Sequence, residues 1–226
     1  MRYHPSKITS PSGRQKPEAE GWLYASLSFS IIMLAGRVLY SGSFLFLFLL
    51  WNLFLAWIPY LITRYGILQT ANKGLLTWLF LFVSWLLFLP NSFYILTDLF
   101  HLKGLLSIGK WFDLTLIASF AWNGLLLGML SIRQMEKQVT VRFRLPSSWI
   151  FLFPVMLLNG MGVYIGRYLR FNSWDIICNP FALASDILGL MLHPLRYHSI
   201  WIMMICFSFF LLLLYTSIKN LARQMQ

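Results

Sequence analysis

The chain has 226 residues, of which 58% are hydrophobic and 11% are charged, and it contains 20 Phe and 10 Trp. A soluble domain of this length could not bury so much apolar surface, so the composition excludes that class and indicates an integral membrane protein. The formal net charge is +11, but the 18 Lys and Arg residues lie singly between apolar runs. Because a nucleic-acid binder needs a clustered basic face, we expect the lipid bilayer and no nucleic acid as a partner.

The first twenty residues are polar and rich in Pro, Ser, Lys and Arg. This composition predicts a disordered tail over residues 1–20. A signal peptide would have a short basic region that leads quickly into an apolar stretch and a small-residue cleavage site, and the tail lacks this pattern. We therefore expect the first apolar run to be retained as a membrane span.

Apolar runs of membrane-spanning length follow in order along residues 21–220, which we interpret as a single transmembrane domain. A hydrocarbon core about 30 Å thick requires roughly 20 residues of helix. Six runs reach or approach this length, near residues 22–40, 43–62, 74–96, 111–132, 148–168 and 199–218. The pattern predicts an all-α, polytopic membrane helix bundle with about six transmembrane helices.

Pro90 interrupts the third run, because it lacks an N–H group and disfavours helix at Leu89. We predict a kink or break there, after which a helix resumes with Asn91 or Ser92 as its N-cap. At 100° per residue, the polar side chains that follow share a stripe about 80° wide. These residues are Asn91, Tyr94, Asp98 and His101.

The predicted partner of this stripe is the segment from Gly160 to Asp175 in the fifth run. Gly162 and Gly166 form a GxxxG pair, and Gly124 and Gly128 form a second pair in the fourth run. Because such pairs allow close helix approach, we expect the fourth and fifth spans to pack together. We also expect Asp98 to lie within salt-bridge reach of Arg167 or Arg170, since a carboxylate near hydrocarbon needs a partner.

A shorter helix is predicted near residues 180–192, between the fifth and sixth runs. Asn179 and Pro180 suit the cap and first position of a helix, and Pro194 suits its end. About thirteen residues give roughly 20 Å of helix, which is too short to span a bilayer. We therefore expect an interfacial or re-entrant helix.

The basic residues predict the orientation, because Lys and Arg accumulate in cytoplasmic loops. With six spans, twelve of the 18 fall on one side, and six on the other: Arg37, Lys103, Lys110, Arg167, Arg170 and Arg196. We therefore expect both termini to be cytoplasmic, with the polar cluster on the outer side of the membrane.

Three strings resemble a known family. They are FLPNSFYILTDLFHL from Phe88, WFD from Trp111, and YIGRYLRFNSWDIICNP from Tyr164. They are similar to the blocks of the bacterial membrane protein family catalogued as domain of unknown function 1361. The resemblance implies a small multi-pass protein of the bacterial cytoplasmic (inner) membrane, and it implies no activity.

The first functional hypothesis is that the outer cluster binds an anionic lipid headgroup or a lipid-linked phosphate. The planar guanidinium of Arg suits phosphate, and Trp and Tyr suit the membrane interface. The ligand-binding candidates are Asn91, Tyr94, Arg167, Arg170, Asn172, Trp174 and Asp175.

A membrane hydrolase or transferase is a second hypothesis, with Asp98, His101 and Asp113 as catalytic candidates. Asp98 lies three residues before His101 and could orient it as a general acid or base. No nucleophile is evident, and the strings G-x-S-x-G and H-E-x-x-H are absent. The sequence therefore leaves open whether the protein is an enzyme, and it identifies no cofactor.

A third hypothesis is a structural or accessory protein whose cluster is only a network of ion pairs between helices. A small transporter would need polar groups near the bilayer midplane, where Asn123 and Asn159 are the candidates. We expect both amides to make hydrogen bonds between helices instead. No metal site is predicted, because no closely paired ligands occur.

Overall fold

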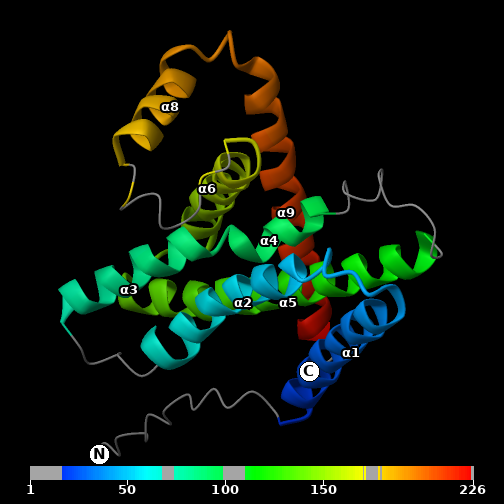
Figure 1. The fold of residues 1–226 in the computed structure, drawn as a ribbon. Coiled ribbons are helices and arrows are strands. Elements are labelled where there is room, and N and C mark those ends of the chain that lie inside the picture. The colour runs from blue at the N-terminus through cyan, green and yellow to red at the C-terminus, as the bar shows by residue number, and fades with distance from the viewer. Residues whose placement is uncertain are drawn as a thin grey trace, which may run out of the picture.

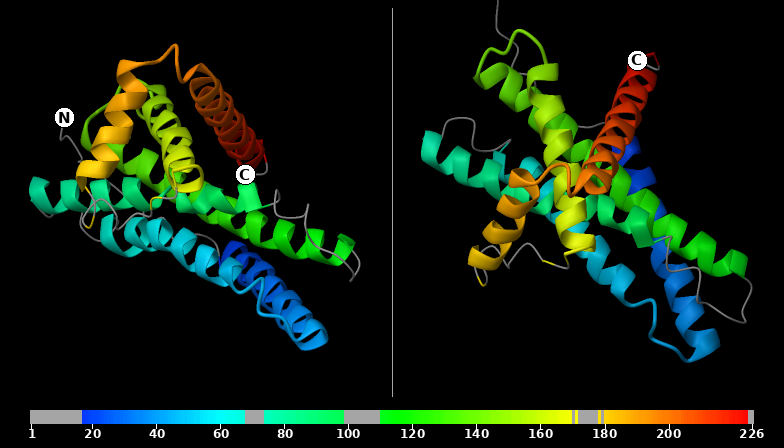
Figure 2. Two further views of the ribbon diagram at one scale, coloured as in Figure 1. Left: turned by 45° about the horizontal axis from the view of Figure 1, so that its top comes forward. Right: turned by 90° about the horizontal axis from the view of Figure 1, so that it is seen from above.

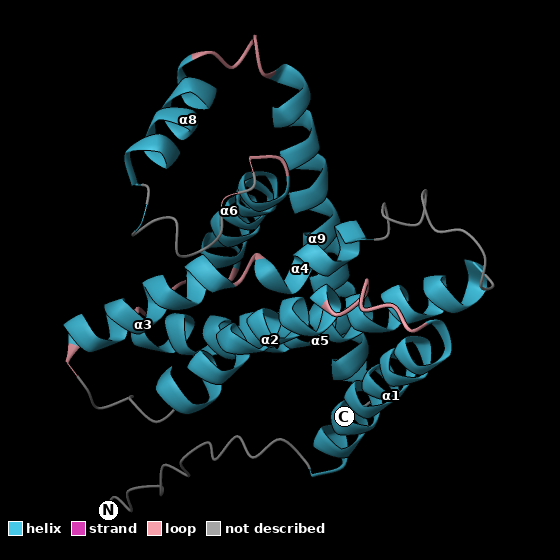
Figure 3. Ribbon diagram, viewed as in Figure 1, coloured by secondary structure: helices cyan, strands magenta, loops and turns pink. Residues whose placement is uncertain are grey.

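The computed structural model describes residues 17–67, 74–98, 110–169, 171, 178 and 180–224. Within these ranges the chain forms helices and connecting loops without strands (Figure 3). The helices are α1 (Pro17–Ser41), α2 (Phe48–Leu61), the π-helix η1 (Ile62–Ile67), α3 (Leu75–Phe88), α4 (Asn91–Thr97), α5 (Lys110–Arg142), α6 (Trp149–Arg167), α8 (Pro180–Leu192) and α9 (His198–Gln224). The predicted all-α bundle is confirmed.

Five helical segments of the described part are long and apolar enough to cross a membrane: Gly21–Ser41, Leu75–Thr97, Trp111–Arg142, Trp149–Arg167 and His198–Gln224. The chain is thus a multi-pass membrane protein. The predicted short helix is also present, since α8 begins at Pro180 and ends at Leu192. Its position at the membrane interface stays a prediction.

The second predicted span differs from the expectation. Gly42 adopts a left-handed conformation with φ of 62°, and turns follow it, so α2 begins at Phe48 and not near residue 43. Pro59 lies inside α2 and lacks a donor for the helix. The Thr63 hydroxyl lies within hydrogen-bond distance of the carbonyls of Pro59 and Tyr60 and of the Gln134 side chain in α5. The chain here continues as the π-helical segment η1. The two helices together run continuously from residue 48 to residue 67.

The helices are arranged around α5. The helix α2 and the α3–α4 segment lie along α5, with α1 packed against it as well, while α6, α8 and α9 rise from one side of this layer (Figures 1 and 2). Leu116 and Phe120 of α5 belong to a core with α1 and α2. Met129 and Ile132, further along α5, belong to a second core with α3, α6 and α9. This arrangement places α4 in the middle of the bundle.

The predicted break at Pro90 is confirmed. The ribbon is interrupted between α3 and α4 (Figure 3). The amide of Ser92 donates to the carbonyl of Leu89 at 3.0 Å, three residues back, so the carbonyl of Phe88 lacks its usual helical donor. The side-chain amide of Asn91 donates to the Phe88 carbonyl at 3.0 Å. The Asn91 side chain therefore satisfies the Phe88 carbonyl that the break leaves without a helical donor. It does not cap α4, because the N-cap residue of α4 is Pro90.

Candidate functional site

The short helix α4 lies between two pairs of glycines. A Cβ atom at Gly124 would lie 2.8 Å from the Ser92 carbonyl oxygen, and one at Gly128 would lie 2.8 Å from the Ser92 side chain. On the other side, a Cβ atom at Gly162 or Gly166 would come closer than 3.0 Å to Pro90 or Tyr94. The fourth and fifth spans, α5 and α6, contact each other as predicted. These glycines do not mediate that contact, because both pairs face α4 and the preceding Pro90. Glycines let α4 approach two helices at once.

This close approach brings Tyr94 of α4 against α6. The Tyr94 hydroxyl donates to the Gly162 carbonyl at 2.9 Å. The Thr97 hydroxyl donates back to the Tyr94 carbonyl at 2.6 Å, near the end of α4. The predicted contact between the polar stripe and the fifth span is thus confirmed at Tyr94, and it fixes the rotation of α4.

Asp98 follows α4 and is fully buried, with 0% of its surface exposed. Its Oδ1 lies 2.9 Å from Nη1 of Arg167, which comes from the last turn of α6. The predicted ion pair between Asp98 and the fifth span is therefore confirmed. The Oδ2 atom accepts a hydrogen bond from the side-chain amide of Asn52, in α2, at 3.0 Å. One carboxylate thus connects three helical segments.

Arg167 is held in a fixed orientation and is still accessible. Besides its contact with Asp98, its Nη2 donates to the Thr97 carbonyl at 3.1 Å. The exposed fraction of its side chain is 29%, compared with 0% for the side chain of Asp98. The basic partner of this pair therefore reaches the surface of the bundle, and the acidic partner lies behind it.

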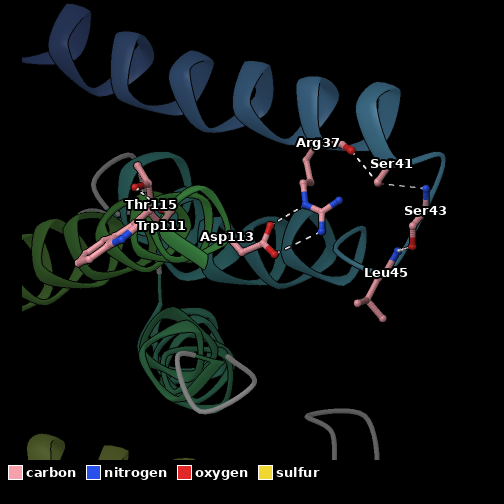
Figure 4. A network of polar contacts seen from close by, with 7 residues as sticks. All are labelled: Arg37, Ser41, Ser43, Leu45, Trp111, Asp113 and Thr115. Atoms are coloured by element: carbon pink, nitrogen blue, oxygen red, sulfur yellow. Dashed lines mark hydrogen bonds and ion pairs between the residues drawn. The ribbon is translucent and has the colours of Figure 1, made fainter. Parts of the chain in front are cut away.

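Asp113 belongs to a different ion pair. It lies in the first turn of α5, and its partner is Arg37 of α1, with Nε 2.5 Å from Oδ1 and Nη2 3.3 Å from Oδ2 (Figure 4). The guanidinium carbon of Arg37 also lies 5.3 Å from the centre of the Phe46 ring. Both charged residues are buried, with 7% and 2% of their surfaces exposed. The partner of Asp113 is therefore in the first span and not in the fifth.

Glu136 forms a third buried ion pair. It lies in the part of α5 that is predicted to face the cytoplasm, and it accepts hydrogen bonds from Lys219 and Tyr215 of α9.

Of the two midplane amides, Asn123 of α5 donates to the Ser26 carbonyl and the Ser30 hydroxyl of α1, as predicted. The Asn159 amide instead donates to the Val155 carbonyl of its own helix. This hydrogen bond is not the contact with another helix that we expected.

Five candidates lie outside the residues that the structure describes: His101, Arg170, Asn172, Trp174 and Asp175. Of the remaining candidates, the structure brings together Tyr94, Asp98 and Arg167. Asn91 donates a hydrogen bond to the Phe88 carbonyl beside Pro90, and Asp113 forms an ion pair with Arg37.

Sequence reasoning missed two residues that contact the candidates, Asn52 and Arg37. Both are polar residues in or beside a long apolar run, and such residues are rare in membrane helices unless they have a partner. That signal could have marked both as members of polar clusters. It could not have indicated which acid each one contacts.

A family model described as "Protein of unknown function (DUF1361)" matches residues 51–214. The matched range contains Asn52, Asp98, Asp113 and Arg167, and it leaves Arg37 and α1 outside. No curated protein and no solved structure matches the chain.

Proposed function

Because the chain belongs to the family of proteins of unknown function DUF1361, which assigns no activity, we propose a function from the polar cluster itself. The protein is a multi-pass protein of the bacterial cytoplasmic membrane, with both termini in the cytoplasm. At Arg167 it binds the phosphate of an anionic lipid or of a lipid-linked phosphate on the outer side.

One observation carries this proposal: a buried carboxylate and a backbone carbonyl orient the Arg167 side chain, and part of that side chain is still exposed. Asp98 and the Thr97 carbonyl hold its position, while 29% of the side chain stays exposed. A guanidinium with a fixed orientation loses less side-chain entropy when it binds phosphate, and its planar fork suits phosphate oxygens. The other ligand-binding candidates, from Arg170 to Asp175, follow closely in the chain and belong to the same proposed site.

The second candidate function is a structural or accessory protein in which the polar residues only hold helices together. Among the described residues, three buried acids each contact a basic residue of another helix: Asp98 with Arg167, Asp113 with Arg37, and Glu136 with Lys219. The same pairing weakens the enzymatic hypothesis, because Asp98 and Asp113 are engaged by basic side chains. Lipid binding at Arg167 distinguishes the two remaining candidates.

The test is a titration of the purified full chain in detergent with phosphatidylglycerol, with a polyprenyl phosphate, with zwitterionic phosphatidylethanolamine and with inorganic phosphate. The readouts are lipid binding by native mass spectrometry and the shift in Tm. We expect the two anionic lipids to bind and stabilise the protein, since a ligand that binds only the folded state raises its stability. Inorganic phosphate alone should give a smaller shift, because it has no hydrocarbon chain.

Arg167→Lys keeps the charge and removes the planar fork, and Arg167→Gln removes both. Arg196→Gln is the matched control, because Arg196 is an exposed Arg that is predicted to face the same side. We expect anionic-lipid binding to be strongly weakened in Arg167→Gln, weakened in Arg167→Lys, and unchanged in the control. Equal binding by folded wild-type and Arg167→Gln protein would reject the site and favour the structural role.

A further inference from the structure

A cavity of about 200 Å³ lies between α8 and the helices α3, α4 and α6. Its walls are almost entirely apolar. Tyr94 is the one lining residue of the described part with a side-chain hydroxyl, and that hydroxyl already donates to Gly162. Its apolar lining includes Leu87, Leu158, Met161, Ile165, Leu183 and Ile187.

Water is a poor occupant of this cavity. A buried water needs two to four polar partners, and an engineered apolar cavity of about 150 Å³ stays dry and binds an apolar guest. The present cavity is larger than that and offers no comparable set of polar groups. A dry empty cavity would leave its lining without packing contacts. An apolar occupant would restore those contacts.

The cavity opens to the surface of the bundle. Leu87 and Leu158 line it and are 37% and 40% exposed, and both lie on helices of membrane-spanning length. The covering helix α8 buries Leu183 and exposes apolar side chains on its other face, among them Phe181 and Leu192. The helix α8 therefore carries apolar side chains on both its buried and its exposed face.

The cavity is distinct from the polar cluster at Arg167. On α6 the cavity-lining Leu158, Met161 and Ile165 lie along one face. At 100° per residue, Arg167 lies about 180° around the helix from Leu158. The contact between Tyr94 and Gly162 lies between the two regions. A ligand in the cavity therefore need not be the one whose phosphate contacts Arg167.

We propose that this cavity binds a hydrocarbon chain of a membrane lipid, which enters from the bilayer between α6 and α8. The lipid tails outside are as apolar as the cavity, so binding is driven by the packing contacts that the chain restores. The cavity therefore selects a lipid by its hydrocarbon chain and not by its headgroup. This inference does not depend on phosphate binding at Arg167.

The test reconstitutes the full chain in vesicles that contain a zwitterionic phosphatidylcholine with a diazirine in the middle of one acyl chain. After photolysis, mass spectrometry locates the labelled peptides. We expect several-fold more labelling around Met161, Ile165 and Ile187 than around Phe209, which is 59% exposed on α9. Equal labelling at the two places would overturn the proposal, because it would show only general lipid contact.

Ile165→Trp fills the cavity, and Phe209→Trp is the control at an exposed position. We expect the first to reduce labelling at Ile187 several-fold and the second to leave it unchanged. Leu183→Trp fills the cavity from α8 and serves if Ile165→Trp does not fold. Unchanged labelling at Ile187 in a folded filled variant would also reject the site. Arg196→Gln, at an exposed position outside both regions, should leave the labelling unchanged. The photolabel is a zwitterionic lipid, so failure of this proposal is seen separately from failure of the anionic-lipid titration.

Discussion

We predict that the two partners of the ion pair between Asp98 and Arg167 differ in how much stability is lost when each is neutralised. Arg167→Gln removes the guanidinium from the fully buried Asp98 carboxylate, which keeps its hydrogen bond from Asn52, and loss of the partner of a buried charge costs about 3–5 kcal/mol. Asp98→Asn leaves a guanidinium that still donates to the Thr97 carbonyl and is 29% exposed. Loss of one hydrogen-bond partner in that setting costs about 1–3 kcal/mol.

The double variant completes the cycle. Asp98→Asn combined with Arg167→Gln removes both charges, so its destabilisation should be smaller than the sum of the single values by about 0.5–3 kcal/mol. The free energies come from reversible unfolding of the purified protein in mixed detergent, with Arg196→Gln as a control for loss of an exposed Arg. Two results contradict the reasoning: additive single effects, or a larger effect of Asp98→Asn than of Arg167→Gln.

The remaining predictions concern packing, the second ion pair and orientation. Gly166→Ala places a methyl group against Tyr94 and should destabilise the protein by about 1–3 kcal/mol, whereas the same change in a Tyr94→Leu background should have little effect. Asp113→Asn leaves the buried Arg37 without its carboxylate and should lower the free energy of unfolding by about 3–5 kcal/mol, with partial recovery when Arg37→Gln is added. Lys137→Cys in a cysteine-free background should react with a membrane-impermeant maleimide only after intact cells are permeabilised, and labelling from outside would reverse the predicted orientation.

The parts of the site that could be predicted depend on local rules. Helical phase placed Tyr94 and Asp98 on one face, and the alternation of spans placed Arg167 on the same side, so their contact followed from the sequence. The break at Pro90 followed from its missing N–H group. The start of α8 at Pro180 followed from the preference of Pro for the first turn.

The parts that could not be predicted depend on which helices are neighbours. The contacts of Asn52 with Asp98 and of Arg37 with Asp113 require α2 and α1 to lie beside particular turns of other helices. A GxxxG pair indicates that another helix approaches closely, but it does not show which one. In this structure both pairs pack against α4 and the preceding Pro90.

The contacts of Asp98 also have a consequence for how the chain enters the membrane during synthesis. Asn52 precedes Asp98 by 46 residues, whereas Arg167 lies 70 residues after Thr97. The carboxylate therefore emerges from the ribosome after its amide partner and well before its basic partner. A lone carboxylate at the centre of a membrane helix costs about 2.5–3.5 kcal/mol on insertion scales, and Asp98, just after the apolar segment Leu75–Thr97, should bear part of that cost. We expect Asn52 to hold Asp98 during that interval, so Asn52→Leu should reduce the yield of inserted protein more than the stability of the protein that has folded.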